Sequence, residues 1–159
     1  MLAATLIRHN TRAMEGPGRP LRILVADDHP LIRLALRRDL ERGGFEICAE
    51  AGTGAEAADA ALRERPDLCL LDVQMPDGGG LAATAAIRRS LPTAKIVLIT
   101  AAPDEDGVLA AARCGADGYL SKGADAGRLP QIICAVVGGE TSYPRRLLYP
   151  LLRALRQAG

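Results

Sequence analysis

A short apolar run that ends on a carboxylate constrains this chain more than any other feature of its sequence. Residues 68–71 are Leu-Cys-Leu-Leu, Pro66 precedes them closely, and Asp72 follows directly. The run is too short for an ordinary helix and is typical of a strand buried on both faces of a parallel sheet. Pro76 and the glycines at 78–80 then predict a loop. Asp72 is therefore expected at the carboxyl end of a buried strand, where open α/β sheets bind ligands. Taken alone, Asp72 is equally consistent with a simple strand cap or the start of a turn.

Composition narrows the class of protein. The chain has 159 residues, enough for one domain with its own core, and 48% of them are hydrophobic. Trp is absent and there is one Phe, so the core is expected to consist of Ala, Leu, Ile and Val. The net charge of +1 gives no argument for binding nucleic acid or a membrane surface. No apolar run is as long as a membrane-spanning helix. The four cysteines lack CxxC spacing, which favours small buried thiols and a reducing cytoplasm; they are Cys48, Cys69, Cys114 and Cys134.

Strand-then-helix units alternate along the chain. We expect strands at 21–26, 45–51, 68–71, 95–100 and 118–121, and helices at about 29–42, 53–65, 81–91, 104–114 and 125–137. This alternation predicts an α/β protein with a doubly wound parallel sheet and right-handed crossovers. The second strand alternates apolar and polar residues, which suits a sheet edge. One face of the first helix is expected to carry Leu31, Leu34, Ala35 and Leu40.

Polar residues stand at the carboxyl ends of four expected strands. They are Asp27 with Asp28, then Asp72, Thr100 and Lys122. Because parallel strands end at the same edge of a sheet, these side chains should share one rim. Three carboxylates brought together repel, which raises the pKa of at least one unless a cation intervenes. A hard divalent ion with oxygen ligands, Mg²⁺ above all, relieves that repulsion.

The rim also predicts phosphoryl chemistry. With a cation present, Asp72 can act as a nucleophile on a phosphoryl group and form an aspartyl phosphate. Lys122 can neutralise one phosphate oxygen, and the Thr100 hydroxyl can donate a hydrogen bond to another.

The chain from about residue 21 to residue 138 resembles the receiver domain of bacterial two-component response regulators. The resemblance rests on five short motifs, which are Asp27-Asp28, Leu71-Asp72, Met75-Pro76 with Gly80, Ile99-Thr100-Ala101 and Tyr119-Leu120-Ser121-Lys122. Residues 27–33, Asp-Asp-His-Pro-Leu-Ile-Arg, are similar to the NarL/LuxR-type subgroup, whose receivers usually precede a helix-turn-helix DNA-binding domain. The resemblance implies a flavodoxin-like five-stranded sheet with strand order 2-1-3-4-5, flanked by five helices.

The resemblance also implies roles for the rim residues. Asp72 is the expected phosphorylation site, and it holds Mg²⁺ together with Asp27 and Asp28. The main-chain carbonyl of Gln74 completes the protein ligands. Lys122 is expected to act with Asp72 as a catalytic residue, by contacting the phosphoryl group.

Thr100 and Tyr119 match the family's switch pair. When phosphate draws the hydroxyl inward, Tyr119 is expected to turn into the space it leaves, which remodels the face built from the fourth helix, fifth strand and fifth helix. Gly107 lies inside that fourth helix and costs about 1 kcal/mol relative to Ala. A weak helix suits a moving element, and the same glycine equally suits a tolerated surface position.

The implied function is a signalling switch and not an enzyme with an external substrate, since a receiver catalyses only its own phosphotransfer and autodephosphorylation. The implied partners are a sensor histidine kinase and a second copy of the chain. DNA contact is expected only through a C-terminal domain absent from these 159 residues, in a cytoplasmic protein that regulates transcription and does not bind membrane.

Two short patterns in the sequence suggest other functions. Residues 52–57, Gly-Thr-Gly-Ala-Glu-Ala, satisfy the dinucleotide-binding pattern G-x-G-x-x-A, but they follow the second strand and leave the rim residues unexplained. An aspartyl-phosphate phosphatase needs a second Asp two residues after the nucleophile, where this chain has Gln74, and a neutral amide cannot protonate a leaving group. His29 beside two acids suggests a transition-metal site, although local packing or a surface position is the preferred interpretation.

The two ends of the chain are expected to lie outside the receiver. Residues 1–20 are predicted to be a flexible N-terminal extension, and residues 139–159 a linker or short helix toward an output domain. Residues 144–159 contain four arginines, no acid, and leucines at roughly helical spacing, a pattern that also suits contact with a membrane or a partner. Pro150 is expected to kink or split any helix there.

Overall fold

A five-stranded parallel sheet forms the centre of the protein. The computed structural model describes residues 15–16 and 18–158. The sheet consists of β3 (Arg22–Ala26), β4 (Glu46–Ala51), β5 (Leu68–Asp72), β6 (Lys95–Thr100) and β7 (Gly118–Ser121), in the order β4-β3-β5-β6-β7. The predicted doubly wound sheet with order 2-1-3-4-5 is confirmed, and β4 lies at an edge as expected.

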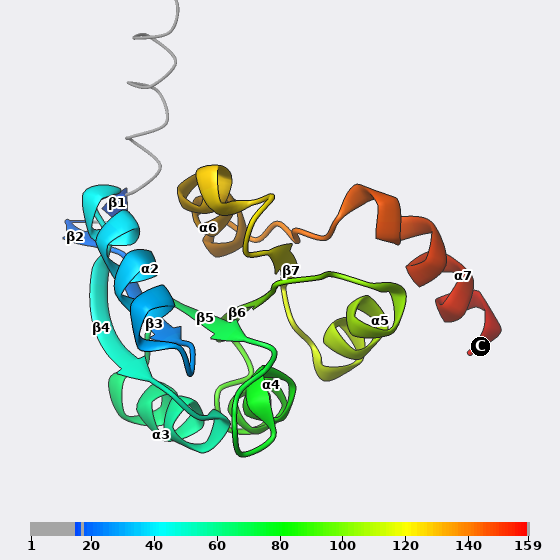
Figure 1. Cartoon of the computed structure of the whole chain (residues 1–159), viewed down its shortest axis with the longest axis horizontal. Coiled ribbons are helices and arrows are strands. Elements are labelled where there is room, and N and C mark those ends of the chain that lie inside the picture. Colours follow the sequence, from blue (N-terminus) through cyan, green and yellow to red (C-terminus); the bar gives the residue numbers. More distant parts are fainter. Residues whose placement is uncertain (1–14, 17, 159) are drawn as a thin grey trace, which may run out of the picture.

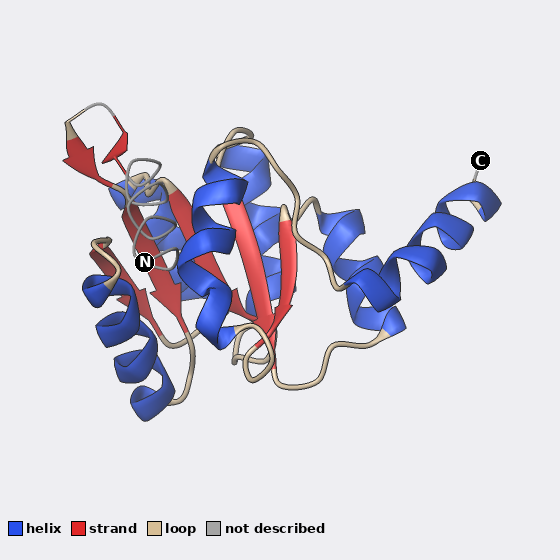
Figure 2. Ribbon diagram, turned by 90° about the horizontal axis from the view of Figure 1, so that it is seen from above, coloured by secondary structure: helices blue, strands red, loops and turns tan. Residues whose placement is uncertain are grey.

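Helices cover both faces of this sheet (Figures 1 and 2). One apolar cluster joins α2 (Pro30–Arg42) and α6 (Leu129–Val137) to the sheet, and a second joins α3 (Gly54–Glu64), α4 (Gly79–Ser90) and α5 (Glu105–Cys114) to the other face. Alternate residues of β3 enter the two clusters, because successive strand side chains point to opposite faces. All five residues of β5 are buried, which confirms the central strand predicted from the apolar run.

Local chemistry explains where the helices begin. Thr53 caps α3, since its hydroxyl accepts a hydrogen bond from the Glu56 amide at 3.1 Å. The helix α4 starts two residues before the predicted position. A Cβ at Gly80 would lie 2.4 Å from the Asp72 carbonyl oxygen, so the glycines let the helix begin directly against the end of β5. The predicted helix at 125–137 is divided into a 3₁₀ turn, η2 (Ala126–Arg128), and α6.

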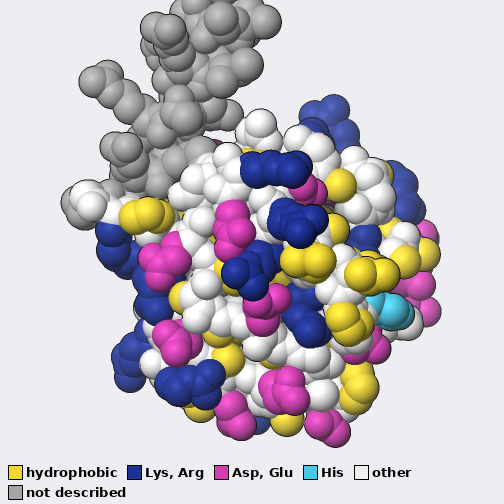
Figure 3. Space-filling model, turned by 60° about the vertical axis from the view of Figure 1, so that its left-hand side comes forward, with side chains coloured by type: hydrophobic (Ala, Val, Ile, Leu, Met, Phe, Trp, Pro, Cys, Tyr) yellow, Lys and Arg dark blue, Asp and Glu magenta, His cyan; other side chains and the backbone are white. Residues whose placement is uncertain are grey.

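The apolar face predicted for α2 is wrong. Of its four residues only Leu40 is buried, whereas the side chains of Leu31 and Leu34 are 80% and 39% exposed and Ala35 is also exposed. The helix turns Leu36 and Leu40 toward the sheet instead. Hydrophobic side chains therefore stand among charged ones on the outer surface of the protein (Figure 3).

The C-terminal residues form a 3₁₀ turn, η3 (Arg145–Leu147), followed by a helix, α7 (Leu148–Gln157), which packs against α5 (Figure 1). The expectation that Pro150 would break this helix is wrong. Pro150 lies in the first turn, where backbone N–H groups have no partner within the helix and a missing N–H costs nothing. None of the helices in the described part of the chain is long and apolar enough to cross a bilayer.

The predicted flexible extension falls mostly on residues 1–14 and 17, which lie outside the described residues. Next to them, β1 (Glu15–Gly16) and β2 (Arg19–Pro20) pair as a short antiparallel hairpin. The Arg19 guanidinium donates to both carboxylate oxygens of Asp67 at 2.8 and 3.0 Å, which ties the hairpin to the residue before β5.

Candidate functional site at the carboxyl ends of the strands

Three charged side chains from three strand ends meet at one rim of the sheet. Asp27 follows β3, Asp72 ends β5, and Lys122 follows β7. The Lys122 ammonium lies 2.7 Å from Asp27 Oδ2 and 2.8 Å from Asp72 Oδ2. The two aspartates are almost fully buried, at 0% and 3% exposure. Buried carboxylates repel unless a cation lies between them, and in this structure Lys122 is that cation.

Asp28 and His29 complete the group on its solvent side. His29 Nδ1 lies 2.9 Å from Asp28 Oδ1 and 3.4 Å from Asp27 Oδ1. One potential ligand atom from each of Asp27, Asp28, His29 and Asp72 lies within 4.8 Å of all the others. Three carboxylates in this space are a donor set that fits a hard divalent cation such as Mg²⁺. The sequence favoured local packing or a surface position for His29, and its side chain is 67% exposed. Its position directly after two acids was the available signal that it faces the same group.

Burial and hydrogen bonding have opposite effects on the pKa values of Asp72 and Lys122. Burial raises the pKa of Asp72, while the Lys122 ammonium and the Gln74 amide, 3.0 Å from Oδ1, partly oppose that rise. Burial lowers the pKa of Lys122, but its bonds to the two carboxylates outweigh that effect, so its pKa is raised overall. Lys122 therefore stays charged and holds Asp72 in place. The role of the Gln74 carbonyl as a metal ligand stays a prediction.

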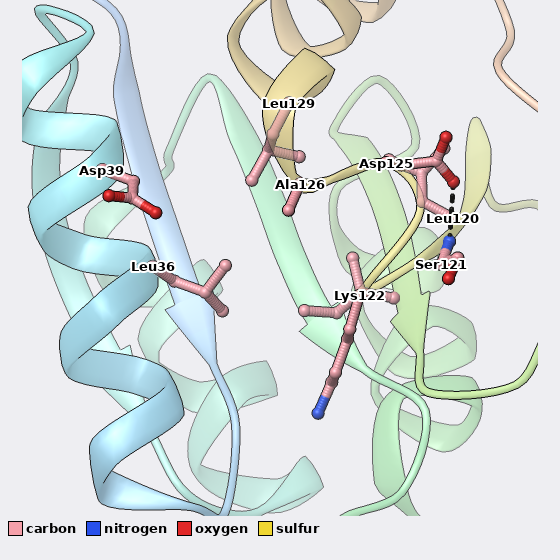
Figure 4. A pocket seen from close by; sticks show the side chains of 9 residues that line it. Leu36, Asp39, Leu120, Ser121, Lys122, Asp125, Ala126 and Leu129 are labelled. Carbon is pink, nitrogen blue, oxygen red and sulfur yellow. Dashed lines mark hydrogen bonds between the residues drawn. The ribbon is translucent and has the colours of Figure 1, made fainter.

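Packing and hydrogen bonds on the side away from the rim fix the position of Lys122. Its stem lines a small pocket between α2 and α6, together with Leu36 and Leu129, and its amino group points away from these leucines (Figure 4). The Asp125 carboxylate accepts a hydrogen bond from the Ser121 amide at 2.8 Å, which closes the turn after β7. Apolar packing of the stem and this turn direct the charge toward the rim.

The two residues of the predicted switch pair lie on adjacent strands. Thr100 ends β6 and is 7% exposed, and Tyr119 in β7 is 2% exposed. The Tyr119 hydroxyl lies against the first turn of α5, where a Cβ on Gly107 would be only 2.0 Å from it. Gly107 thus leaves room for the tyrosine, a steric reason that the sequence pattern did not indicate.

The glycine pattern at 52–57 has a structural explanation as well. A Cβ on Gly54 would lie 2.6 Å from the carbonyl oxygen of Asp77 and 2.7 Å from that of Gly79, and the Gly54 amide donates to the Pro76 carbonyl at 2.9 Å. The loop after β5 therefore covers the start of α3, where a dinucleotide pyrophosphate would have to bind. This packing argues against the dinucleotide-binding alternative.

Known proteins with the same sequence pattern and fold are response regulators. A family model described as the response regulator receiver domain matches residues 23–134. The nitrate/nitrite response regulator protein NarP of Escherichia coli is 40% identical over 129 residues, which cover 80% of this chain and 60% of NarP. A LuxR-family two-component response regulator from Aurantimonas sp. has a crystal structure with a TM-score of 0.78 and 31% identity, covering 86% of this chain and 98% of that one. The signal receiver domain of the putative response regulator NarL from Mycobacterium tuberculosis gives a TM-score of 0.73 at 31% identity, over 77% and 99% of the two chains. The chain spans about three-fifths of the length of NarP.

Proposed function

Because this chain belongs to the response regulator receiver family, we propose that it is a phosphorylation-driven signalling switch with Asp72 as its phosphoacceptor. The observation that supports this most strongly is the contact of the Lys122 ammonium with both buried carboxylates, Asp27 and Asp72, at the carboxyl ends of the strands. An aspartate held in this way is oriented for attack, and a cation already lies where negative charge would arrive.

In the proposed reaction a carboxylate oxygen of Asp72 attacks the phosphorus of a phosphohistidine on a partner kinase. The new P–O bond forms as the P–N bond breaks, and the histidine nitrogen keeps the electron pair of the broken bond. Lys122 then neutralises one phosphoryl oxygen, and the Thr100 hydroxyl donates to another. A small donor such as acetyl phosphate would serve in place of the kinase.

Receiver domains generally bind Mg²⁺ at an acidic pocket, and an acidic cluster stands at the corresponding rim of this chain. Asp27, Asp28 and Asp72 would hold the ion, with the Gln74 carbonyl as a further ligand. When bound, Mg²⁺ supplies positive charge that offsets the carboxylates and attracts phosphate oxygens.

The proposed output is a change in the face formed by α5, β7 and α6, transmitted from Thr100 to Tyr119. This change would control association with a second copy or with an output domain. Relatives such as NarP are longer than this chain, so regulation of transcription, with DNA bound through a C-terminal domain, is a proposal for the whole protein in the cytoplasm. Direct DNA binding by these residues is not expected.

Phosphorylation of Asp72 is tested with acetyl phosphate and Mg²⁺ on phosphate-affinity gels. We expect a shifted band for the wild type that is lost on heating or in alkali, and no shifted band for Asp72→Asn, which keeps the shape and removes the nucleophile. The matched control is Asp77→Asn, an exposed aspartate in the following loop, which should shift like the wild type. An undiminished shift in Asp72→Asn would contradict the proposal.

The metal site is tested by thermal unfolding with and without MgCl₂. A ligand at about a hundred times its dissociation constant stabilises the folded state by about 2.7 kcal/mol. We expect this response in the wild type and in Asp59→Ala, whose exposed carboxylate is on α3. Asp28→Ala should lose the response, while its metal-free stability stays the same or rises because repulsion is removed. Equal stabilisation of all three proteins would exclude the acidic pair as the site.

A further inference from the structure

The C-terminal segment, residues 142–157, is attached to the backbone of the switch tyrosine. Ser142 forms a parallel bridge with Gly118 at the outer edge of β7. The Tyr119 amide donates to the Ser142 carbonyl at 2.9 Å, and the Ser142 amide donates to the Asp117 carbonyl at 3.0 Å. The last strand of the sheet therefore gains a partner at the residue that the switch is expected to move.

Apolar packing continues this attachment. Leu147 is 3% exposed and belongs to the same buried cluster as Tyr119 and Val108 of α5. Leu151, one turn later in α7, is also buried. The segment thus packs against α5, and Figure 1 shows α7 next to that helix.

Two polar contacts connect the segment to the loops on either side of the ring. The Tyr143 hydroxyl donates to the Ala116 carbonyl, just before β7. The Arg146 guanidinium donates to the Pro103 carbonyl at 2.8 Å, in the loop between β6 and α5. That loop begins directly after Thr100, so the segment contacts the backbone of Tyr119 and the loop that follows Thr100.

The tyrosine ring packs against the first turn of α5, and we call the space that it fills there the Tyr119 slot. Gly107 and the rest of the first turn of α5 form one side of the slot, with a gap so narrow that a methyl group at 107 would overlap the hydroxyl. Leu147 of the C-terminal segment belongs to the same buried cluster as the ring. If the ring turned toward Thr100, the slot would lose its filling and the buried cluster that includes Leu147 would lose packing.

We propose that residues 142–157 are the first output element of the switch. They pack on α5 and β7 while Tyr119 fills its slot, and they are released when phosphorylation turns the ring toward Thr100. This inference rests on the proposed function. While the segment is in place it covers part of the α5 and β7 surface, so a second copy can reach that surface only after release.

Hydrogen–deuterium exchange of the full chain with Mg²⁺, with and without beryllofluoride as a phosphoryl mimic, tests the inference. Loss of a ring-sized contact corresponds to roughly a tenfold change in an opening equilibrium. We expect amide exchange in residues 142–157 to rise by about that factor in the wild type. Thr100→Ala, which lacks the hydroxyl between phosphate and ring, should show no rise.

A glycine pair provides a matched comparison without the mimic. Gly107→Ala places a methyl group in the Tyr119 slot and should loosen residues 142–157 without beryllofluoride. Gly127→Ala, at a glycine with no atom within 4 Å of the added methyl, should exchange like the wild type. Loosening of the segment in Gly107→Ala alone supports the role of the slot, and equal exchange in both variants overturns it.

The outcomes separate the inference from the function on which it rests. A mimic that changes exchange around Asp72 and Lys122 but leaves residues 142–157 unchanged, or lowers their exchange, overturns the inference and leaves the phosphorylation switch standing. A mimic that changes exchange nowhere in the chain overturns the proposed function and the inference together.

Discussion

The rim of the sheet and the C-terminal segment are held by different kinds of contact. At the rim, buried charges are paired directly. The Asp27 carboxylate, for example, accepts one bond from the Lys122 ammonium and one from the His29 amide. The segment buries one side of α7 and leaves the other open, with Leu148, Leu152 and Leu155 between 40% and 59% exposed. Removing one partner from a buried ion pair is costly, whereas a helix with one shallow contact face opens locally at small cost. The rim is therefore suited to keep its charged side chains in fixed positions. The C-terminal segment is suited to open and close locally.

The largest effect is expected for Lys122→Met, which leaves two buried carboxylates facing each other. We expect a loss of about 3 kcal/mol in the free energy of unfolding, measured in urea at neutral pH without Mg²⁺. The control is Lys95→Met, at the end of β6 away from the rim, which should lose much less stability. Adding Asp27→Asn to Lys122→Met should restore part of the stability. Equal losses in the two lysine variants would mean that the rim pairing is not what stabilises this part of the fold.

Gly107→Ala tests the packing of Tyr119 against α5, because the substitution has two effects of opposite sign on the free energy of unfolding. Alanine favours a helix by about 1 kcal/mol over glycine, and overpacking the Tyr119 slot costs about 1–3 kcal/mol. We expect net destabilisation in the wild type and net stabilisation when Tyr119 is replaced by Leu, which vacates the space near the hydroxyl. A double-mutant cycle of unfolding free energies measures this reversal of sign. The same change in both backgrounds would show that methyl and ring do not compete.

Tyr143→Phe removes the hydroxyl that binds the Ala116 carbonyl and should cost about 1 kcal/mol at neutral pH. Tyr149→Phe alters a 73% exposed tyrosine in the same segment and should stay within about 0.5 kcal/mol of the wild type.

Tyr143→Phe should also change how the stability of the fold depends on pH. Burial raises the pKa of Tyr143 from 10.0 to about 12, so the folded chain keeps a proton that the unfolded chain has lost within this window. Stability from this group is complete below pH 10.0 and falls as pH rises toward about 12. Across that window the wild type should lose more stability than Tyr143→Phe. Parallel losses in the two proteins would assign the alkaline transition to other groups.

The smallest effect is expected for Arg146→Ala, because its bond to the Pro103 carbonyl is exposed. Global unfolding should change by no more than about 0.5 kcal/mol. Exchange of residues 142–157 should nevertheless rise, since local opening depends on the few contacts of the segment. The control is Arg153→Ala on the exposed side of α7. A rise of the same size in both variants would point to lost helix stability and not to the contact with the loop.

Hydrophobic periodicity was sufficient to predict the strands of the sheet, but not the buried face of every helix. The run at 68–71 predicted a buried strand correctly, and the parallel order then brought Asp27, Asp72 and Lys122 to one rim. On α2 the same reasoning chose the wrong face. Arg33 is half-buried there, with its guanidinium bonded to the Asp27 carbonyl at 2.6 Å, and a count of apolar residues cannot anticipate that an arginine takes such a position.

Contacts between distant segments were beyond the sequence pattern. The leucines of residues 144–159 indicated an amphipathic stretch, but nothing in their spacing identified β7 and α5 as the surface they meet. The space that Gly107 leaves for Tyr119 is equally invisible, because it depends on the packing of α5 against β7. The Lys122 bridge was missed in part for a related reason, since its ammonium was assigned to an incoming phosphate and not to the resting carboxylates.

The bridge between Ser142 and Gly118 has a consequence for whatever replaces the segment. Once Ser142 leaves, the Tyr119 N–H and the Asp117 C=O stand unpaired at a bare strand edge, and such edges bind extended chains. A parallel peptide restores both bonds through one residue, as Ser142 does now, and an antiparallel peptide restores them through two residues on either side of the one opposite Gly118. The released form would therefore offer backbone groups that bind an extended chain before any side chain is recognised.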